Sequence, residues 1–235
     1  MNLLKRIYSI LLKKYGFQGW WPLLDCKGRN PTKTGSIKGY HSGDYSHPKN
    51  NNQRFEICIG AILTQNTSWP QVEKALLNLK GLKALTPQAI KKLNLEKLKQ
   101  VIKPSGYFNQ KAGKIKEFTD FYLSLKNKSP ARDELLNVWG IGPETADSIL
   151  LYAFNVPEFV VDAYTRRIFS KLGFIKKHAS YEDIKKLFEK NLPKNPRIYQ
   201  EYHALIVEHA KRYYSKKPYG ENDPLLKAIK IKRFK

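Results

Sequence analysis

Apolar side chains recur at helical spacing along most of this chain. In MNLLKRIYSILLKKYG, for example, leucines and isoleucines three or four positions apart would line one face of an amphipathic helix. Residues that favour helix starts precede some of the periodic segments: Thr86 before Pro87, Ser129 before Pro130, and Ser180 with an acid three positions later. The pattern predicts helices over 1–17, 55–69, 70–82, 87–103, 109–126, 131–138, 144–154, 163–172, 180–190 and 197–215.

Two internal stretches interrupt this pattern. Residues 26–53 are polar and rich in Gly, Asn, Pro and Ser, which predicts an irregular loop or a packed arm and not a core element. The run EFVVDAY is apolar, but Pro157 before it and Asp162 within it favour a connector. No segment alternates long enough to predict a strand, so an all-α fold is expected. The charged end, LLKAIKIKRFK, should be a solvated tail or an additional phosphate contact.

The charge of the chain indicates a class of partner. Its 235 residues include 43 Lys and Arg against 20 Asp and Glu, a formal charge of +23, and 41% hydrophobic residues indicate a folded globule. Part of this charge serves solubility, but the surplus favours nucleic acid over a membrane surface or a merely basic enzyme. No apolar run approaches the roughly 20 residues that span a bilayer. The N-terminal helix also lacks the small-residue cleavage site of a signal peptide.

The cysteine content argues against a metal or disulfide framework. Cys26 and Cys58 are the only cysteines, too few for a zinc or iron–sulfur ligand set, so no cofactor is expected. A reduced, cytoplasmic protein associated with the nucleoid is predicted. The segment YHSGDYSHP could suggest a metal site, but its spacing matches no specific one, and a structured loop is favoured for His41, Asp44, Tyr45 and His47.

The segment WGIGPET, residues 139–145, places two glycines between two predicted helices. Glycine amides that no side chain covers, next to a helix N-terminus, can hold a phosphate oxygen. An ordinary helix–helix turn is the alternative, and the tripeptide alone favours it. Downstream, Asp162 begins another predicted helix, where it could serve as an N-cap or as a functional acid.

Taken together, residues 138–173 resemble the helix–hairpin–helix DNA glycosylase superfamily, to which endonuclease III belongs. The shared features are a hairpin, then a Gly- and Pro-containing loop, then one essential aspartate, and weaker similarity extends from Gly19 to Pro218. The resemblance implies a two-lobed all-α fold with the active site in the cleft between the lobes. The expected layout is 1–68 as part of one lobe, 69–178 as a central lobe with the hairpin at 131–154, and 179–235 completing the first lobe with a basic tail.

The resemblance also implies roles for individual residues. Asp162 would be the catalytic carboxylate, stabilising positive charge on the sugar as the base leaves and orienting or deprotonating the attacking water. The base must first be flipped from the duplex. The implied partner is therefore double-stranded DNA with a damaged base, bound by a monomer. Hairpin main-chain amides would hold a DNA phosphate, with contacts at Gly140, Ile141, Gly142 and Thr145.

Two departures from the superfamily narrow this expectation. Members that also cut the strand carry a lysine where this chain has Glu144, and a carboxylate cannot form a Schiff base, so no lyase activity is expected. Glu144 is interpreted as a helix-start residue that favours the helix dipole. Many relatives carry iron–sulfur cysteines where this chain has Tyr213, Gly220 and Asp223, so no cluster is expected. That segment should fold by ordinary packing, which leaves basic side chains for phosphates: Lys211, Arg212, Lys216 and Lys217.

The segments GWWP (19–22), GAILTQNTSW (60–69) and SGYFNQKA (105–112) are similar to the bacterial 3-methyladenine DNA glycosylase III branch. By that resemblance Trp20, Trp21 and Trp69 surround the flipped base, although by spacing alone adjacent tryptophans are more often core. An alkylated purine is cationic, attracted to aromatic faces, and already a good leaving group. The branch has a pocket lysine where this chain has Leu205, which leaves the lesion range open.

Gln65 and Asn66 are candidates to fill the gap left by the flipped base, with helix-end capping or a buried amide network as an equal alternative. The helix CIGAILTQNT carries no glutamate near Gln65, where adenine-mismatch relatives place their acid. The leading function is thus hydrolytic excision of an alkylated purine such as 3-methyladenine. The alternatives are a monofunctional glycosylase for oxidised pyrimidines or mismatched thymine or uracil, and a catalytically silent DNA-binding protein.

Overall fold

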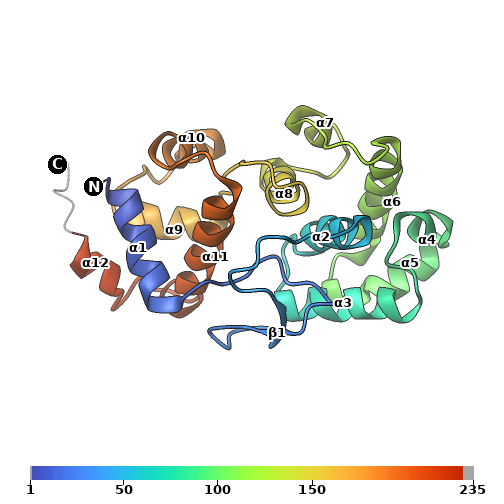
Figure 1. The fold of residues 1–235 in the computed structure, drawn as a ribbon, viewed down its shortest axis with the longest axis horizontal. Coiled ribbons are helices and arrows are strands. Elements are labelled where there is room, and N and C mark those ends of the chain that lie inside the picture. Colours follow the sequence, from blue (N-terminus) through green and yellow to red (C-terminus); the bar gives the residue numbers. More distant parts are fainter. Residues whose placement is uncertain (1, 230–235) are drawn as a thin grey trace.

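The structure is a computed structural model that describes residues 2–229, and its helical content confirms the expected all-α class (Figure 1). One short antiparallel pair, β1 (Gly28–Arg29) and β2 (Lys38–Tyr40), lies in the polar stretch. None of the described helices is long and apolar enough to cross a membrane. The helical elements are α1 (Leu3–Tyr15), α2 (Asn51–Leu63), α3 (Trp69–Gly81), α4 (Pro87–Lys92), α5 (Leu95–Ile102), η1 (Lys103–Ser105), α6 (Phe108–Ser124), α7 (Arg132–Leu136), α8 (Pro143–Ser148), η2 (Ile149–Ala153), α9 (Ala163–Lys171), α10 (Tyr181–Asn191), α11 (Pro196–Tyr213) and α12 (Pro224–Ala228).

The helices form two lobes (Figure 1). The hairpin lobe contains α2 to α8 with η1 and η2, residues 51–153, and the terminal lobe contains α1 together with α9 to α12. In the terminal lobe, α1 packs on α10 and α11, and α9 packs on α11. Segment η2 packs against α11 and so joins the two lobes. The chain therefore starts in the terminal lobe, builds the hairpin lobe, and returns.

The helices that α2 and α9 contact show where each of them lies in the fold. Helix α2 belongs to the hairpin lobe, where it packs against α3, α6, α8 and η2, and α9 belongs to the terminal lobe. The reason lies in the sequence of α2, since FEICIGAIL is apolar on nearly every side and each of residues 55–63 is buried. A helix of this kind must be surrounded by others, so it becomes the centre of a lobe.

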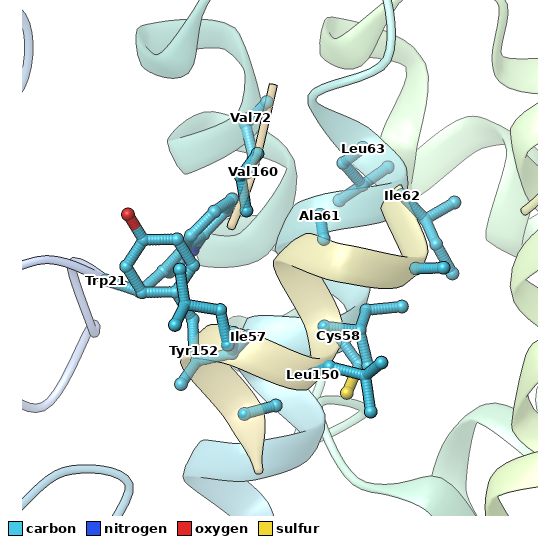
Figure 2. Close-up of a cluster of buried hydrophobic side chains, with 14 of the residues drawn as sticks. Trp21, Ile57, Cys58, Ala61, Ile62, Leu63, Val72, Leu150, Tyr152 and Val160 are labelled. Carbon is cyan, nitrogen blue, oxygen red and sulfur yellow. The ribbon is translucent and has the colours of Figure 1, made fainter. Parts of the chain in front are cut away.

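Figure 2 shows the buried cluster around α2, which also receives side chains from α3, η2 and two connecting segments: Trp21, Ile57, Cys58, Ala61, Ile62, Leu63, Val72, Leu150, Tyr152 and Val160. Burying one large apolar side chain of this kind contributes about 1.5–3 kcal/mol. Glu56 is the buried acid of the helix; its Oε1 accepts the Leu24 N–H at 2.7 Å, and burial raises the pKa of Glu56 to about 7. This bond ties the segment after the paired tryptophans to α2.

Local departures from the predicted helices have identifiable causes. The expected helix 87–103 divides into α4 and α5, because Asn94 caps α5 by accepting two main-chain N–H groups. Ser129 is not a cap: α7 begins after Ala131, whose N–H donates to the Glu134 carboxylate at 2.6 Å. The other two expected caps are present, at Thr86 and Ser180.

The polar arm, residues 26–50, packs against both lobes. The Thr34 hydroxyl donates to Glu208 of α11, and the Ser36 hydroxyl donates to Glu73 of α3 at 2.6 Å. Of the two alternatives for this stretch, the packed arm is therefore the correct one.

The histidines of the arm form hydrogen-bond contacts within the arm and with the segments next to it. The two ring nitrogens of His41 lie 2.8 Å from the Asp44 carbonyl oxygen and 2.9 Å from the Trp21 carbonyl oxygen. His47 Nδ1 lies 3.0 Å from Gln53 Oε1. Within residues 2–229, no three His, Cys, Asp or Glu side chains gather as a metal site requires.

A buried polar network includes Asp223, one of the three positions matched to cluster cysteines. Asp223 Oδ1 lies 2.9 Å from His209 Nε2, and Asp223 Oδ2 accepts the Tyr214 hydroxyl at 2.6 Å. Tyr15 of α1 closes the network at 2.9 Å from His209 Nδ1. Because this segment supplies no thiolate and both oxygens of Asp223 are engaged, its residues do not fit an iron–sulfur cluster. The segment folds through these hydrogen bonds and not by ordinary apolar packing alone.

Two of the four basic side chains expected at phosphates are paired within the protein. Lys211 and Arg212 both lie at the Glu208 carboxylate, Lys211 at 3.8 Å. The expected phosphate contact of the basic tail depends mostly on residues 230–235, which lie outside the described residues. Arg212, Lys216 and Lys217 are exposed, whereas Lys211 is half-buried.

Candidate active site

The hairpin between α7 and α8 is a tight turn that requires glycine. Gly140 has a φ of +81°, and a Cβ at this position would lie 2.5 Å from the Lys114 side chain. The Ile141 N–H donates to the Val138 carbonyl oxygen at 3.0 Å, so this amide is already hydrogen-bonded within the turn. Over residues 2–229, the amides of Gly140 and Gly142 have no protein acceptor. The turn therefore offers these two main-chain donors to a ligand.

Gln65 braces the hairpin from the end of α2. Its Nε2 donates to the Gly140 carbonyl oxygen at 3.0 Å and to Thr145 Oγ1 at 3.1 Å, while its Oε1 accepts from Lys114 Nζ at 2.7 Å. Gln65 thus takes part in an amide network, the second of the alternatives open for it. Asn66 differs, since it is exposed and its backbone is left-handed, with a φ of +54°.

A buried carboxylate anchors the hairpin to the terminal lobe. Asp147 of α8 has no exposed side-chain surface; it accepts from Arg132 Nε at 2.7 Å and from the Tyr181 hydroxyl at 2.8 Å. Lys185 Nζ lies 3.7 Å from the same carboxylate, and Arg132 also pairs with Glu182 at 2.6 Å. Because three of these partners belong to α10, the network sets the position of the hairpin relative to the terminal lobe.

Asp162 ends the connector and caps α9. Its Oδ1 accepts the Thr165 N–H at 2.7 Å and the Thr165 hydroxyl at 2.8 Å, which confirms the N-cap interpretation. Its Oδ2 takes no part in the cap and lies 3.8 Å from His203 Nε2. Burial alone would raise the pKa of Asp162, but the His203 ring and the Thr165 bonds outweigh burial and hold this pKa below its usual 3.8. One ionised oxygen is thus left for chemistry.

Glu144 is a second carboxyl group beside Asp162. As expected it lies at the start of α8, where it is exposed to solvent. Burial first, and the Asp162 carboxylate second, raise the pKa of Glu144 to about 7. Two neighbouring carboxyl groups whose pKa values move in opposite directions are typical of a site that performs acid–base chemistry.

Aromatic rings surround His203 on the side of the paired tryptophans. The Trp20 ring is perpendicular to the His203 ring, with centroids 5.8 Å apart. The Trp21 ring lies 5.2 Å from Tyr152 and 5.4 Å from Trp69, both edge-on, and Figure 2 shows Trp21 beside Tyr152 in the buried cluster. The structure thus brings the three tryptophans together, with Trp21 in the core and Trp20 partly exposed.

Helix α11 presents a lysine to Trp20, at a position other than the one matched to a pocket lysine. Leu205 has no exposed surface and packs in the core. Lys211 Nζ, two turns further on, lies 5.8 Å from the centroid of the Trp20 ring. Burial lowers the pKa of Lys211.

Two residues at this site were not identified from the sequence. His203 is a polar residue within the apolar run of α11, a signal that could have been noticed, and it is 5% exposed. Tyr107 is 66% exposed and left-handed, with a φ of +47°, and it directly precedes α6. The buried Lys111 ammonium donates to one carbonyl at the end of α2 and one in the 105–107 loop. The loops that carry Asn66 and Tyr107 are therefore neighbours.

Comparison with proteins of known sequence identifies the family. The model of the HhH-GPD superfamily base excision DNA repair protein matches residues 59–194. A Methanocaldococcus jannaschii protein, described as a candidate DNA repair glycosylase, is 43% identical over 235 residues, which cover 95% of this chain and 94% of the relative. Endonuclease III of Sulfolobus acidocaldarius is 31% identical over 170 residues, 70% of this chain and 76% of its own.

Solved structures agree with this assignment. The H. pylori 3-methyladenine DNA glycosylase bound to 1,N6-ethenoadenine is 27% identical and superposes with a TM-score of 0.64, over 89% of this chain and 96% of that one. An endonuclease III in non-covalent complex with DNA shares the fold at 21% identity, with a TM-score of 0.74 over 97% of this chain and 93% of that one. The chain belongs to the HhH-GPD superfamily of base excision DNA repair proteins, the DNA glycosylase family that its hairpin and aspartate resemble.

Proposed function

We propose that this protein is a hydrolytic DNA glycosylase that removes an N-alkylated purine, such as 3-methyladenine, and leaves an abasic site in an intact strand. The observation that carries the proposal is the free oxygen of Asp162, which is unused by the α9 cap and faces His203 beside the Trp20 ring. A carboxylate in this position stabilises the positive charge that develops on the sugar as the glycosidic bond breaks.

The hairpin is assigned to a DNA phosphate. The amides of Gly140 and Gly142 and the Thr145 hydroxyl would donate to its oxygens, whereas the Ile141 amide is already bonded within the turn. Phosphate contacts position the duplex without reading its sequence. Their role is to set the distance from the backbone to the catalytic carboxylate.

The gap left by the flipped base is assigned to two neighbouring loops. Asn66 and Tyr107 are exposed at the tips of these loops, and both are suited to replace the contacts that the base loses. Gln65 is held by the hairpin, so it would position its loop without entering the gap.

Hydrolysis without strand cleavage follows from the residue after the hairpin. A Schiff base with the sugar requires an amine, and Glu144 supplies a carboxyl group instead. Water is then the nucleophile that remains, and the expected product is an abasic site.

The alkylated purine is supported by the aromatic and electrostatic character of the site. A cationic base is attracted to a tryptophan face by about 0.5–2 kcal/mol, depending on desolvation. The three tryptophans lie together, and the similar H. pylori structure is that of a 3-methyladenine glycosylase. The base keeps the electron pair of the broken bond and becomes neutral, so its attraction to the tryptophan faces weakens after cleavage.

The test is base release from duplexes that carry one lesion each, measured in single turnover with wild type and Asp162→Asn. Asparagine keeps an oxygen for the Thr165 cap, so α9 stays capped while the charge is lost. We expect the wild type to release 3-methyladenine and Asp162→Asn to do so about 100-fold more slowly. Thr86→Ala removes the cap of α4, away from the site, and serves as the matched control, with the wild-type rate expected.

Two outcomes would contradict this proposal. Full activity of Asp162→Asn would show that the carboxylate is only a helix cap. Tight binding of damaged duplexes without release of any base would identify a catalytically silent DNA-binding protein.

A neutral lesion is the second candidate, and Glu144 is the observation that favours it. A carboxyl group with a pKa of about 7 can donate a proton at neutral pH. An oxidised pyrimidine or a mismatched thymine or uracil needs such a proton as it leaves, whereas a cationic purine does not. Glu144→Gln should therefore leave release of 3-methyladenine unchanged; a loss of about 100-fold on a neutral base would favour the second candidate.

A further inference from the structure

His203 holds a buried nitrogen to which no protein group is bonded. The residue lies in the middle of α11 and is 5% exposed, and its Nε2 has no hydrogen-bond partner. An unsatisfied buried polar group costs about 1–3 kcal/mol. In folded proteins such groups are few, and each needs an explanation, such as a catalytic role or a bound water molecule.

The other ring nitrogen determines where the proton of the neutral ring lies. The Tyr152 hydroxyl is 2.7 Å from His203 Nδ1 and 3.2 Å from the Gln200 carbonyl oxygen. A carbonyl can only accept, so both contacts are satisfied only when Tyr152 donates to Gln200 and accepts the Nδ1–H. The Gln200 side chain is itself held by Leu151 and Asn155. This arrangement leaves a lone pair on Nε2.

That lone pair faces the carboxylate of Asp162. The 3.8 Å between Nε2 and Oδ2 is too long for a hydrogen bond, and two acceptors cannot bond to each other. A water molecule has two protons to donate, so one water within reach of both atoms would satisfy them together. The titratable groups that face His203 are Asp162 at the start of α9, Glu144 on α8 and Tyr152 on η2.

The two groups are suited to different parts of the reaction. Asp162 Oδ1 accepts two hydrogen bonds from Thr165, which favour the ionised carboxylate and make it a negative charge but a weak proton acceptor. The lone pair of an imidazole nitrogen can accept a proton from a bound water molecule, as a general base does. Stabilising the sugar cation and deprotonating water therefore need not fall on one residue.

We propose that His203 is a second catalytic residue, which takes the proton of the attacking water through Nε2 while Asp162 stabilises the sugar cation. This inference rests on the proposed hydrolytic function. The water oxygen forms the new bond to C1′, and the C1′–N bond breaks with its electron pair leaving on the base. One water proton passes to His203, and the imidazolium so formed lies beside the Asp162 carboxylate.

The test uses His203→Asn in the full-length protein. The asparagine amide takes the place of Nδ1–H and can still donate to Tyr152, but Nε2 is removed. We expect single-turnover base release at a fixed neutral pH to fall about 100-fold. Affinity for a duplex with a tetrahydrofuran abasic analogue should stay unchanged. His178→Asn, the same substitution at an exposed histidine, is the matched control with wild-type behaviour expected.

The outcomes separate this inference from the function on which it rests. If wild type releases the base and His203→Asn does so at the same rate, His203 is only packed and the inference is overturned. If wild type releases no base from any lesion, the proposed function itself fails. Nitrogen-15 NMR of the wild-type histidine rings needs neither activity nor a folded variant: a proton on Nδ1 supports the inference, and a proton on Nε2 in the neutral ring overturns it.

Discussion

Asp147 connects α7, α8 and α10, and removing its charge measures how firmly the hairpin is held to the terminal lobe. In Asp147→Asn one oxygen can still accept from Arg132, but Arg132 and the buried Lys185 lose the negative charge between them. Lys185 keeps Glu158 and Glu189 as partners, which limits the loss. Removing one partner of a buried pair costs about 3–5 kcal/mol, and with one hydrogen bond retained we expect about 3 kcal/mol.

Asp120→Asn is the matched control. Asp120 pairs with Lys91 at 2.8 Å, but the two side chains are 63% and 57% exposed. An exposed pair of this kind contributes about 0–1 kcal/mol. Both substitutions raise the net charge of an already basic protein by the same amount, so general charge repulsion cancels between them, and the difference reports burial.

The measurement is urea unfolding followed by circular dichroism, together with thermal unfolding. For a chain of this size each kcal/mol shifts the melting temperature by about 2–4 °C, so Asp147→Asn should melt about 6–12 °C below wild type. Asp120→Asn should melt close to wild type. Free energies of unfolding for the two variants that agree within about 0.5 kcal/mol would refute the reasoning, because burial would then have made no difference.

Three further predictions concern the hairpin, the C-terminal network and the lyase position. Gly140→Ala places a Cβ against Lys114 at a φ of +81°, so affinity for the abasic-analogue duplex should fall about tenfold, the equivalent of ~1.4 kcal/mol. The control Gly81→Ala adds a Cβ in open space and should bind the duplex as wild type does. Burial would raise the pKa of Asp223, but His209 and Tyr214 hold this pKa below 3.8. The ionised carboxylate therefore stabilises the fold at neutral pH, and this stability is lost as pH falls through the folded pKa. The free energy of unfolding of Asp223→Asn, followed by tryptophan fluorescence, should thus decrease less with falling pH than that of wild type. Borohydride should trap no covalent DNA adduct with wild type and should trap one with Glu144→Lys, as read on a denaturing gel; an adduct with wild type would disprove the hydrolytic assignment.

The fold class and most helices follow from the sequence because apolar period and cap residues are local signals. FEICIGAIL predicts a helix, but its burial on every side, which makes α2 the centre of a lobe, depends on partners distant in sequence. The helix expected over 87–103 is divided by the Asn94 cap, and the hydrophobic periodicity, which continues across Asn94, does not reveal this division. Long-range packing therefore decides which helices surround α2, and local signals do not reveal it.

The site is less accessible to sequence reasoning than the fold. Asp162 is recognised from the motif, and the structure adds that its two oxygens differ in use. No sequence signal shows that Gln65 reaches the hairpin at Gly140, because that contact spans 75 positions. His203 had a signal, a polar residue within an apolar helical run, but its meaning depends on the Tyr152 hydroxyl from another lobe.

The division of the site between the lobes has a mechanical consequence. Gly140 and Gly142 belong to the hairpin lobe, whereas Asp162 and His203 belong to the terminal lobe. Distances between bound phosphate and carboxylate are then set by contacts that cross the boundary, at the Asp147 network and at η2 against α11. Because catalysis is sensitive to displacements of about 1 Å, loosening either contact should slow base release even though neither touches DNA. The buried carboxylate that stabilises the fold is thus also part of what aligns the substrate.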